Sequence, residues 1–236
     1  FQGSTTGLDG DGLNAAVSGD TNAICDDDRT PDYTYPSCGG IAENGCSWTQ
    51  CSVDDVAFSA ALVQKVSANV CIDSDRVYAV GGSNGGMFVW DLGRDERSAE
   101  VFRAVAPILG LPHRGYLDPP VSESGMPVIS ITGSRDRTVP PGEWGQDTFT
   151  TTSDGDVYYY SSASAITKVW AEAHGCDATV PAEPVDIGSS SMECRGWSYC
   201  QSDSQWPPVM DCRGDMGHVY NLSSSWPLIL DFFEQL

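Results

Sequence analysis

Ser83 stands between closely spaced glycines, directly after a short run that predicts a strand. Residues 77–80 are rich in β-branched and aromatic side chains, and residues 81–85 read Gly-Gly-Ser-Asn-Gly. A nucleophilic serine in a tight strand-to-helix turn needs small residues two positions before and after it, because side chains there would collide. The turn would also aim the backbone N–H of Asn84 at an acyl oxygen that gains charge. The pattern predicts a nucleophile, and a purely structural glycine turn is the alternative.

Two later segments could supply a base and an acid for such a serine. Asp136 follows an apolar run at 126–132, in the loop beyond a predicted strand, where open α/β sheets gather their functional groups. The alternative for Asp136 is an ion pair with Arg135 or Arg137. His218 lies in a loop flanked by glycine, ahead of the last predicted helix.

The chain order Ser83, Asp136, His218 is the order in which the α/β-hydrolase sheet brings these three residue types to one edge. In this interpretation His218 takes the proton of Ser83 and returns it to the leaving alkoxide, while Asp136 fixes the imidazole tautomer. Only two other histidines exist. We expect His174 to be a charge partner at the C-terminal end of a helix, and His113 to be pocket wall or plain surface.

Helices and strands alternate around these segments. A capping-box-like start at residues 52–55 predicts an amphipathic helix to about Asn69, in which Val56, Ala60, Val63, Val66 and Val70 recur at a spacing of three to four residues. Other predicted elements are a buried helix after Ser83, strands at 102–109, 126–132 and 209–212, a helix at 163–174, and a hairpin or loop at 180–192. A last helix is expected from Ser223 or Ser224, burying Leu228, Ile229, Phe232 and Phe233. This alternation predicts a single α/β domain over residues 1–236, with a doubly wound, mostly parallel sheet.

The N-terminal region has a different composition. Residues 1–22 are rich in Gly, Ser, Thr and Asp, with a possible short helix at 13–17 and a brief strand at 21–25. Residues 26–50 predict a long loop pinned by disulfides. The aspartates at 9, 11 and 26–28 are better explained by solvated turns than by a calcium site.

The overall charge excludes several partners. The 236 residues include 12 Lys and Arg against 33 Asp and Glu, a formal net charge of −21. Such a surface repels nucleic acid and anionic membranes. No apolar run approaches the roughly 20 residues of a membrane-spanning helix, and the first residues do not resemble a signal peptide. We expect a monomer that uses no cofactor and no metal.

Nine cysteines and few histidines favour disulfides over zinc. No Cys-x-x-Cys pair occurs among the nine cysteines. Disulfides form and persist in oxidising compartments, so we expect an extracellular protein. The odd count leaves at least one thiol free or paired outside this sequence. We expect a tie between Cys71 and the loop cysteines, and pairing among Cys176, Cys194, Cys200 and Cys212.

Several of these segments together resemble the secreted feruloyl esterase and polyhydroxybutyrate depolymerase group of α/β-hydrolases. The most specific blocks are Cys-Ser-Val-Asp-Asp-Val-Ala-Phe at 51–58 and the run from Cys71 to Met87; pieces at 102–107, 127–140, 170–176 and 217–218 agree. The resemblance covers about residues 48 to 236. It implies an α/β-hydrolase three-layer sandwich and a serine carboxylesterase with Ser83, Asp136 and His218 as its triad.

The resemblance also carries expectations for the start of the chain. The backbone N–H of Phe1 or Gln2 would be the second oxyanion donor beside that of Asn84, and the first strands of the sheet would precede residue 1. The family usually has a tryptophan where this chain has Tyr220, and often a histidine where it has Thr132.

The substrate expected from this resemblance is a hydroxycinnamoyl ester of plant polysaccharide. Aromatic residues that could line the pocket are Trp144, Tyr158, Tyr159, Tyr160, Trp206 and Tyr220. Such a pocket would also hold a short polyester, so a polyhydroxyalkanoate depolymerase is an alternative. A catalytically impaired polysaccharide-binding homologue is the alternative outside the enzymes.

Overall fold

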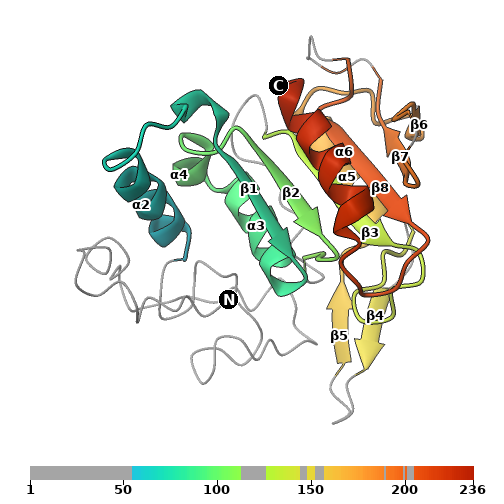
Figure 1. Ribbon diagram of the computed structural model, residues 1–236. Coiled ribbons are helices and arrows are strands. Elements are labelled where there is room, and N and C mark those ends of the chain that lie inside the picture. The colour runs from blue at the N-terminus through green and yellow to red at the C-terminus, as the bar shows by residue number, and fades with distance from the viewer. Residues whose placement is uncertain are drawn as a thin grey trace.

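A six-stranded, mostly parallel sheet forms the centre of the computed structural model, which describes residues 55–112, 126–143, 148–151, 157–188, 190–198, 200 and 205–236. The strand order, seen across Figure 1, is β1 (Tyr78–Gly82), β2 (Ala104–Ile108), β3 (Val128–Gly133), β8 (Val209–Gly214), β7 (Glu193–Gly196) and β6 (Glu183–Val185). The first four strands run parallel, and β7 and β6 continue the sheet antiparallel. The predicted α/β class and mostly parallel sheet are confirmed.

The helices cover both faces of this sheet. They are α2 (Asp55–Ser67), the 3₁₀ turn η5 (Ser74–Arg76), α3 (Asn84–Arg94), α4 (Glu96–Ala99), α5 (Ala163–Ala173) and α6 (Leu222–Glu234). α3 and α5 pack with one face of the sheet in a first apolar cluster, and α6 packs on the other face in a second. Figure 1 shows α6 lying along the sheet beside β8 and β3.

Both central strands are buried because helices cover them on each side. Every residue of β3 is buried, and five of the six residues of β8 are buried. Alternate residues enter different clusters: Val128 and Val209 contact the first, while Ile129 and Met210 contact the second. A continuous apolar run such as 126–132 is typical of a parallel strand buried on both faces.

The last two helices match their predictions closely. α5 ends where Gly175 adopts a left-handed φ of 65°, as the sequence indicated. α6 buries the four predicted residues, Leu228, Ile229, Phe232 and Phe233. Its N-cap is Asn221 rather than a serine two or three residues later.

Two features of the described elements were not predicted. The apolar face assigned to α2 is incomplete, because Val66 and Val70 are exposed. A separate antiparallel hairpin, β4 (Thr148–Thr151) with β5 (Val157–Tyr160), lies between β3 and α5 in the chain.

Two disulfides join the four C-terminal cysteines, as predicted. Cys194 and Cys212 face one another in the register of β7 and β8, and Cys176 is bonded to Cys200. Cys71 is exposed and carries a free thiol in the described part, so its predicted tie to the loop cysteines is not found there. Cross-links of this kind are typical of an oxidising compartment.

Some predictions concern residues outside the described ones. They include the N-terminal helix and strand, the disulfide-pinned loop, the aspartate-rich turns and His113. Within the described ranges, none of the helices combines the length and apolar character that crossing a membrane requires.

Candidate active site

Ser83 occupies a strained turn between β1 and α3. Its φ of 52° and ψ of −121° are unusual for a residue with a side chain, and such conformations cost roughly 1–3 kcal/mol. The backbone holds the turn on both sides, because the Ser83 N–H donates to the carbonyl of Ile108 at 2.7 Å and the Met87 N–H donates to that of Ser83 at 3.0 Å. The turn therefore presents the side chain at the carboxyl edge of the sheet.

The glycines around Ser83 are needed to different degrees. A Cβ on Gly81 would stand 2.2 Å from the carbonyl oxygen of Gly85, so no side chain fits there. A Cβ on Gly110, just after β2, would stand 2.2 Å from the carbonyl oxygen of Ser83. A Cβ on Gly85 would have no described atom within 4 Å, so the described residues do not account for the predicted requirement for a small residue there. At Gly81 the crowding comes from the first turn of α3, and at Gly110 it comes from the backbone of Ser83.

Asn84 is the first residue of α3 and is exposed. The backbone N–H groups in the first turn of a helix have no partner inside that helix, and they carry its positive end. The N–H of Asn84 is therefore available to an anionic oxygen placed beside Ser83. The other two expected oxyanion donors, Phe1 and Gln2, lie outside the described residues.

Asp136 is buried in the loop that follows β3. One carboxylate oxygen, Oδ1, accepts hydrogen bonds from the backbone N–H groups of Thr138 at 2.8 Å and Val139 at 2.9 Å. The alternative ion pair is not formed with Arg135, whose Nε lies 2.7 Å from Oδ1 of Asp215 instead. The second carboxylate oxygen of Asp136 is thus left to face another partner.

His218 joins the acid to the serine. Its Nδ1 lies 2.7 Å from Oδ2 of Asp136, and its Nε2 lies 2.9 Å from Oγ of Ser83. A carboxylate only accepts hydrogen bonds, so the tautomer that satisfies both contacts carries its proton on Nδ1 and accepts the Ser83 hydroxyl proton at Nε2. The structure therefore brings together three side chains from 83, 136 and 218 in a geometry suited to proton transfer.

Of the predicted pocket residues, Tyr220 reaches this site. Its ring centre lies 6.5 Å from that of His218, and its Cε1 would be 2.4 Å from a Cβ on Gly82. The ring therefore packs against the backbone immediately before Ser83. Tyr220 is 51% exposed, so about half of its surface is accessible to solvent.

The other aromatic candidates do not gather there. Trp206 packs with the cluster under α6 and its backbone N–H donates to Gln235 at the far end of that helix, so it lies near the amino edge of the sheet. Tyr160 is buried in the core on the opposite face. Trp144 and the side chains of Tyr158 and Tyr159 are outside what the structure describes.

An apolar groove of about 530 Å³ runs beside the turn. It lies between α2, β1 and α3, and its lining includes Phe58, Gly82, Gly85 and Phe88. Ser83, Asp136 and His218 are not part of its lining. The groove thus flanks the backbone of the nucleophile turn rather than the reacting atoms.

His174 does not have its predicted role. It caps α5 but is 6% exposed, and its Nε2 has no hydrogen-bond partner among the described residues. Burial lowers the pKa of His174 below its ordinary value of 6.5, and a hydrogen bond to the backbone of Met126 acts in the opposite direction. A neutral ring is a poor charge partner for the helix end.

Side chains suited to a metal do not converge in the described part of the chain. No group of three or more His, Cys, Asp or Glu residues there is placed to hold an ion. The arrangement of Ser83, His218 and Asp136 can by itself move a proton from a hydroxyl and create a nucleophile.

The chain was compared with protein families and with curated proteins. No protein-family model matches the chain, and no curated protein matches it significantly. The interpretation of this site therefore depends on its geometry and on the motifs in the sequence.

Several residues around the site carry no signal in the sequence. Gly110 and Leu109, which has a φ of 51°, wrap the end of β2 around the serine turn. Close packing by Gly110 depends on a neighbouring strand, which a local pattern does not reveal. Arg213 and Glu143 contact one another across 70 residues of the chain.

Proposed function

We propose that this chain is a secreted serine carboxylesterase of the α/β-hydrolase type that cleaves feruloyl or related hydroxycinnamoyl esters of plant cell-wall polysaccharide. The observation that carries the proposal is the line of contacts from Ser83 through His218 to Asp136, at 2.9 and 2.7 Å. The strained turn at Ser83 supports it, because backbone strain of this kind concentrates at functional sites.

The reaction would proceed through an acyl-enzyme. His218 Nε2 takes the proton of Ser83 as Oγ attacks the ester carbonyl, and Asp136 stabilises the imidazolium that forms. The N–H of Asn84 stabilises the developing oxyanion. His218 then gives its proton to the departing alkoxide oxygen of the polysaccharide, and water releases the acid by the same steps in reverse order.

Tyr220 supports a hydroxycinnamoyl acyl group. Its half-exposed ring lies beside both His218 and the backbone of Gly82, where it could stack on a planar aromatic acid. Secretion is supported by the two disulfides, which are typical of an oxidising compartment.

Polyester hydrolysis is a second candidate, favoured by one surface feature. A row of exposed apolar side chains begins beside His218 and continues along α6 at a spacing of four residues: Val219, Tyr220, Leu222, Trp226 and Leu230. Residues four apart lie on the same face of a helix, so the last three form one stripe. A stripe of this kind suits an uncharged, water-insoluble polymer better than a hydrated polysaccharide.

Labelling with a fluorophosphonate tests the enzyme class. We expect a single modification at Ser83 in the native protein and none in Ser83→Ala. If the folded native protein remains unlabelled and hydrolyses no ester, the non-catalytic alternative replaces this proposal.

A substrate panel separates the two candidates. Methyl ferulate should be hydrolysed faster than hydroxybutyrate oligomers if the feruloyl assignment is right, and the order should reverse for a polyester depolymerase. Trp226→Ser is the matched surface variant: it should reduce activity on a polyester film only in the second case, and leave soluble esters unaffected in both.

A further inference from the structure

Two segments carry the acid and the base of the candidate site, and they are joined at one end by backbone contacts. We name residues 133–143, which contain Asp136, the acid loop, and residues 213–218, which end at His218, the base segment. Ser134 donates to the carbonyl of Gly214 from its N–H at 2.9 Å and from its hydroxyl at 3.1 Å. The N–H of Arg135 donates to the carbonyl of Met216 at 3.0 Å.

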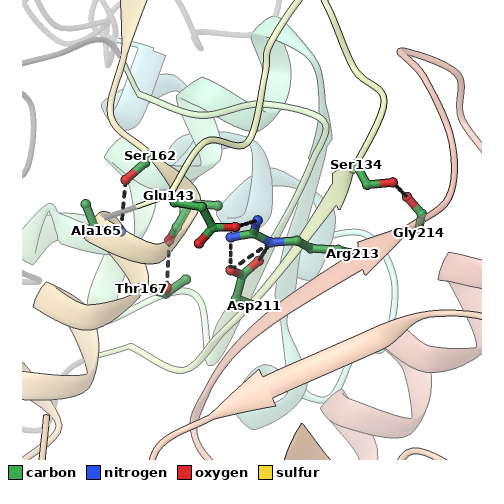
Figure 2. A network of polar contacts seen from close by, with 9 residues as sticks. Ser134, Glu143, Ser162, Ala165, Thr167, Asp211, Arg213 and Gly214 are labelled. Atoms are coloured by element: carbon green, nitrogen blue, oxygen red, sulfur yellow. Dashed lines mark hydrogen bonds and ion pairs between the residues drawn. The ribbon is translucent and has the colours of Figure 1, made fainter. Parts of the chain in front are cut away.

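The opposite end of the acid loop is joined to the base segment by Arg213. Its Nη1 lies 2.5 Å from Oε1 of Glu143, the last residue of the acid loop. The same guanidinium contacts the carboxylate of Asp211 through Nη2 at 2.8 Å and Nε at 3.2 Å. Figure 2 shows Arg213 between the two carboxylates, with Ser134 and Gly214 forming the other tie nearby.

Asp211 holds this guanidinium in place. It is 5% exposed on β8, and burial raises its pKa above the ordinary value, while hydrogen bonds from Arg213 act against the rise. Burial also lowers the pKa of Arg213, but the hydrogen bonds and charges of Asp211 and Glu143 together outweigh it and leave the pKa raised. A buried carboxylate with two contacts to one planar guanidinium fixes its orientation better than a single exposed pair would.

We propose that Arg213 is a positioning residue: held by Asp211 and bound to Glu143, it closes the second tie between acid loop and base segment and so keeps Asp136 within hydrogen-bond distance of His218. The inference rests on the proposed function, because it assigns Arg213 a role in that site.

Contacts inside the acid loop cannot replace this tie. The N–H groups of Thr138 and Val139 orient the carboxylate of Asp136 within the loop, but they belong to the loop and would move with it. The carbonyl of Pro141 accepts from the N–H of Ala163, which secures the loop to α5 rather than to the base segment. Along the acid loop, Asp136 lies between two contacts with the base segment. The first is made by Ser134 and Arg135, and the second, after Val139, is the contact of Glu143 with Arg213.

Glu143→Ala tests the tie without disturbing a buried charge, since the Glu143 side chain is 60% exposed. We expect kcat on p-nitrophenyl butyrate to fall about tenfold, with KM and melting temperature unchanged. Arg213→Met should lower kcat more, by about 10²-fold, a size typical of a displacement near 1 Å at a reacting group. Arg213→Lys, which keeps the charge but not the planar fork, should recover part of the loss.

Arg195→Met is the matched control. Arg195 lies opposite Asp211 in the register of β7 and β8 and is exposed, and among the described residues no hydrogen bond or ion pair joins its side chain to the acid loop. This variant removes the same charge and should leave kcat unchanged.

A double-mutant cycle separates positioning from simple stabilisation. In an Asp136→Asn background, itself expected to lower kcat about 10⁴-fold, adding Glu143→Ala should cause no further loss. A further tenfold loss there, a normal kcat in Glu143→Ala, or an equal loss in Arg195→Met would overturn the proposal.

A readout without turnover keeps the inference independent of the esterase assignment. The low-field proton resonance of His218 Nδ1–H should persist in the native protein and Arg195→Met, and should broaden by exchange in Glu143→Ala. If the native protein proves to hydrolyse no ester, the proposed function fails, while this resonance still decides whether Arg213 and Glu143 hold the pair. An unchanged resonance in Glu143→Ala contradicts the positioning role.

Discussion

The two sides of the candidate site are held in place by different means. On the nucleophile side, Ser83 is fixed by backbone contacts and by glycines that permit close approach, with Gly81 and Gly110 the tightest. On the acid and base side, Asp136 and His218 lie on separate segments that polar groups tie together, including Arg213.

The difference follows from where each side chain stands in the chain. Ser83 sits at the junction of two elements that contact each other, so local sterics suffice to place it. Asp136 and His218 are 82 residues apart and depend on loops, which need specific bonds to hold a fixed separation. The nucleophile side should therefore be sensitive to volume, and the other side to charge and pH.

Replacing Ser83 gives the largest expected effect and tests the nucleophile side directly. Ser83→Ala should lower kcat about 10⁶-fold, because no oxygen remains to form the acyl-enzyme. Ser83→Gly should be equally inactive but more stable to unfolding than Ser83→Ala by about 1 kcal/mol. Glycine relieves the strain of the positive φ, and this gain exceeds its larger loss of backbone entropy on folding. Urea unfolding of the two variants measures the difference. Equal stability would mean that the turn is not strained.

Alanine substitutions at Gly81 and Gly85, two residues before and two residues after Ser83, test whether the nucleophile side is sensitive to volume at one position and not at the other. Gly81→Ala forces a Cβ against the carbonyl oxygen of Gly85, so we expect roughly 1–3 kcal/mol of destabilisation and a large loss of activity. In Gly85→Ala the added methyl group contacts no described atom, and the position lies in a helix. The variant should therefore fold normally, with a free energy of unfolding raised by about 0.5–1 kcal/mol. Thermal melts and ester hydrolysis check both. A severe defect in Gly85→Ala would contradict this account.

Local patterns predicted much of the fold. Residues 126–132 are continuously apolar, and the strand they form is buried on both faces. The periodic spacing of Leu228, Ile229, Phe232 and Phe233 predicted the buried face of α6. The juxtaposition of residues 83, 136 and 218 followed from chain order and from the position of each after an element.

The features that were not predicted depend on neighbours distant in the chain. Whether Gly85 is needed depends on what surrounds it, and the sequence does not reveal this. Trp206 was expected at the pocket because it is aromatic, yet it stands at the other end of α6, by Gln235. Arg213 and Glu143 belong to no periodic pattern, so their tie is visible only in three dimensions.

The contact between Gly82 and Tyr220 joins the nucleophile side to the acid and base side. Disturbing it should reduce activity less than the substitutions above. Gly82→Ala places a methyl group against the tyrosine ring, which must move away from His218. We expect KM for methyl ferulate to rise about tenfold with a small change in kcat, because the ring would no longer stack on the acyl group.

Tyr220→Ala provides the control for that substitution. It should raise KM to a similar extent, and adding Gly82→Ala to it should change nothing further, since the clash has been removed. Additive effects in the double variant would show that Gly82 matters for a reason other than the tyrosine ring.

The pH dependence of folding gives the smallest expected effect and concerns buried polar groups such as His174. Because burial lowers its folded pKa below 6.5, the unfolded chain binds more protons between the two pKa values. Stability should therefore rise with pH through the window just below 6.5 and fall as the solution is acidified, by about 1.4 kcal/mol for each unit of pKa difference.

His174→Asn should reduce this slope, since asparagine can keep a hydrogen bond to the backbone of Met126 but does not titrate. The measurement is urea unfolding of native and variant proteins from pH 5 to pH 8. At pH 8 the two should differ only by the packing of the smaller side chain, which serves as the internal control. An unchanged acid-side slope in His174→Asn would mean that another group causes it, and that burial of this imidazole does not couple folding to pH.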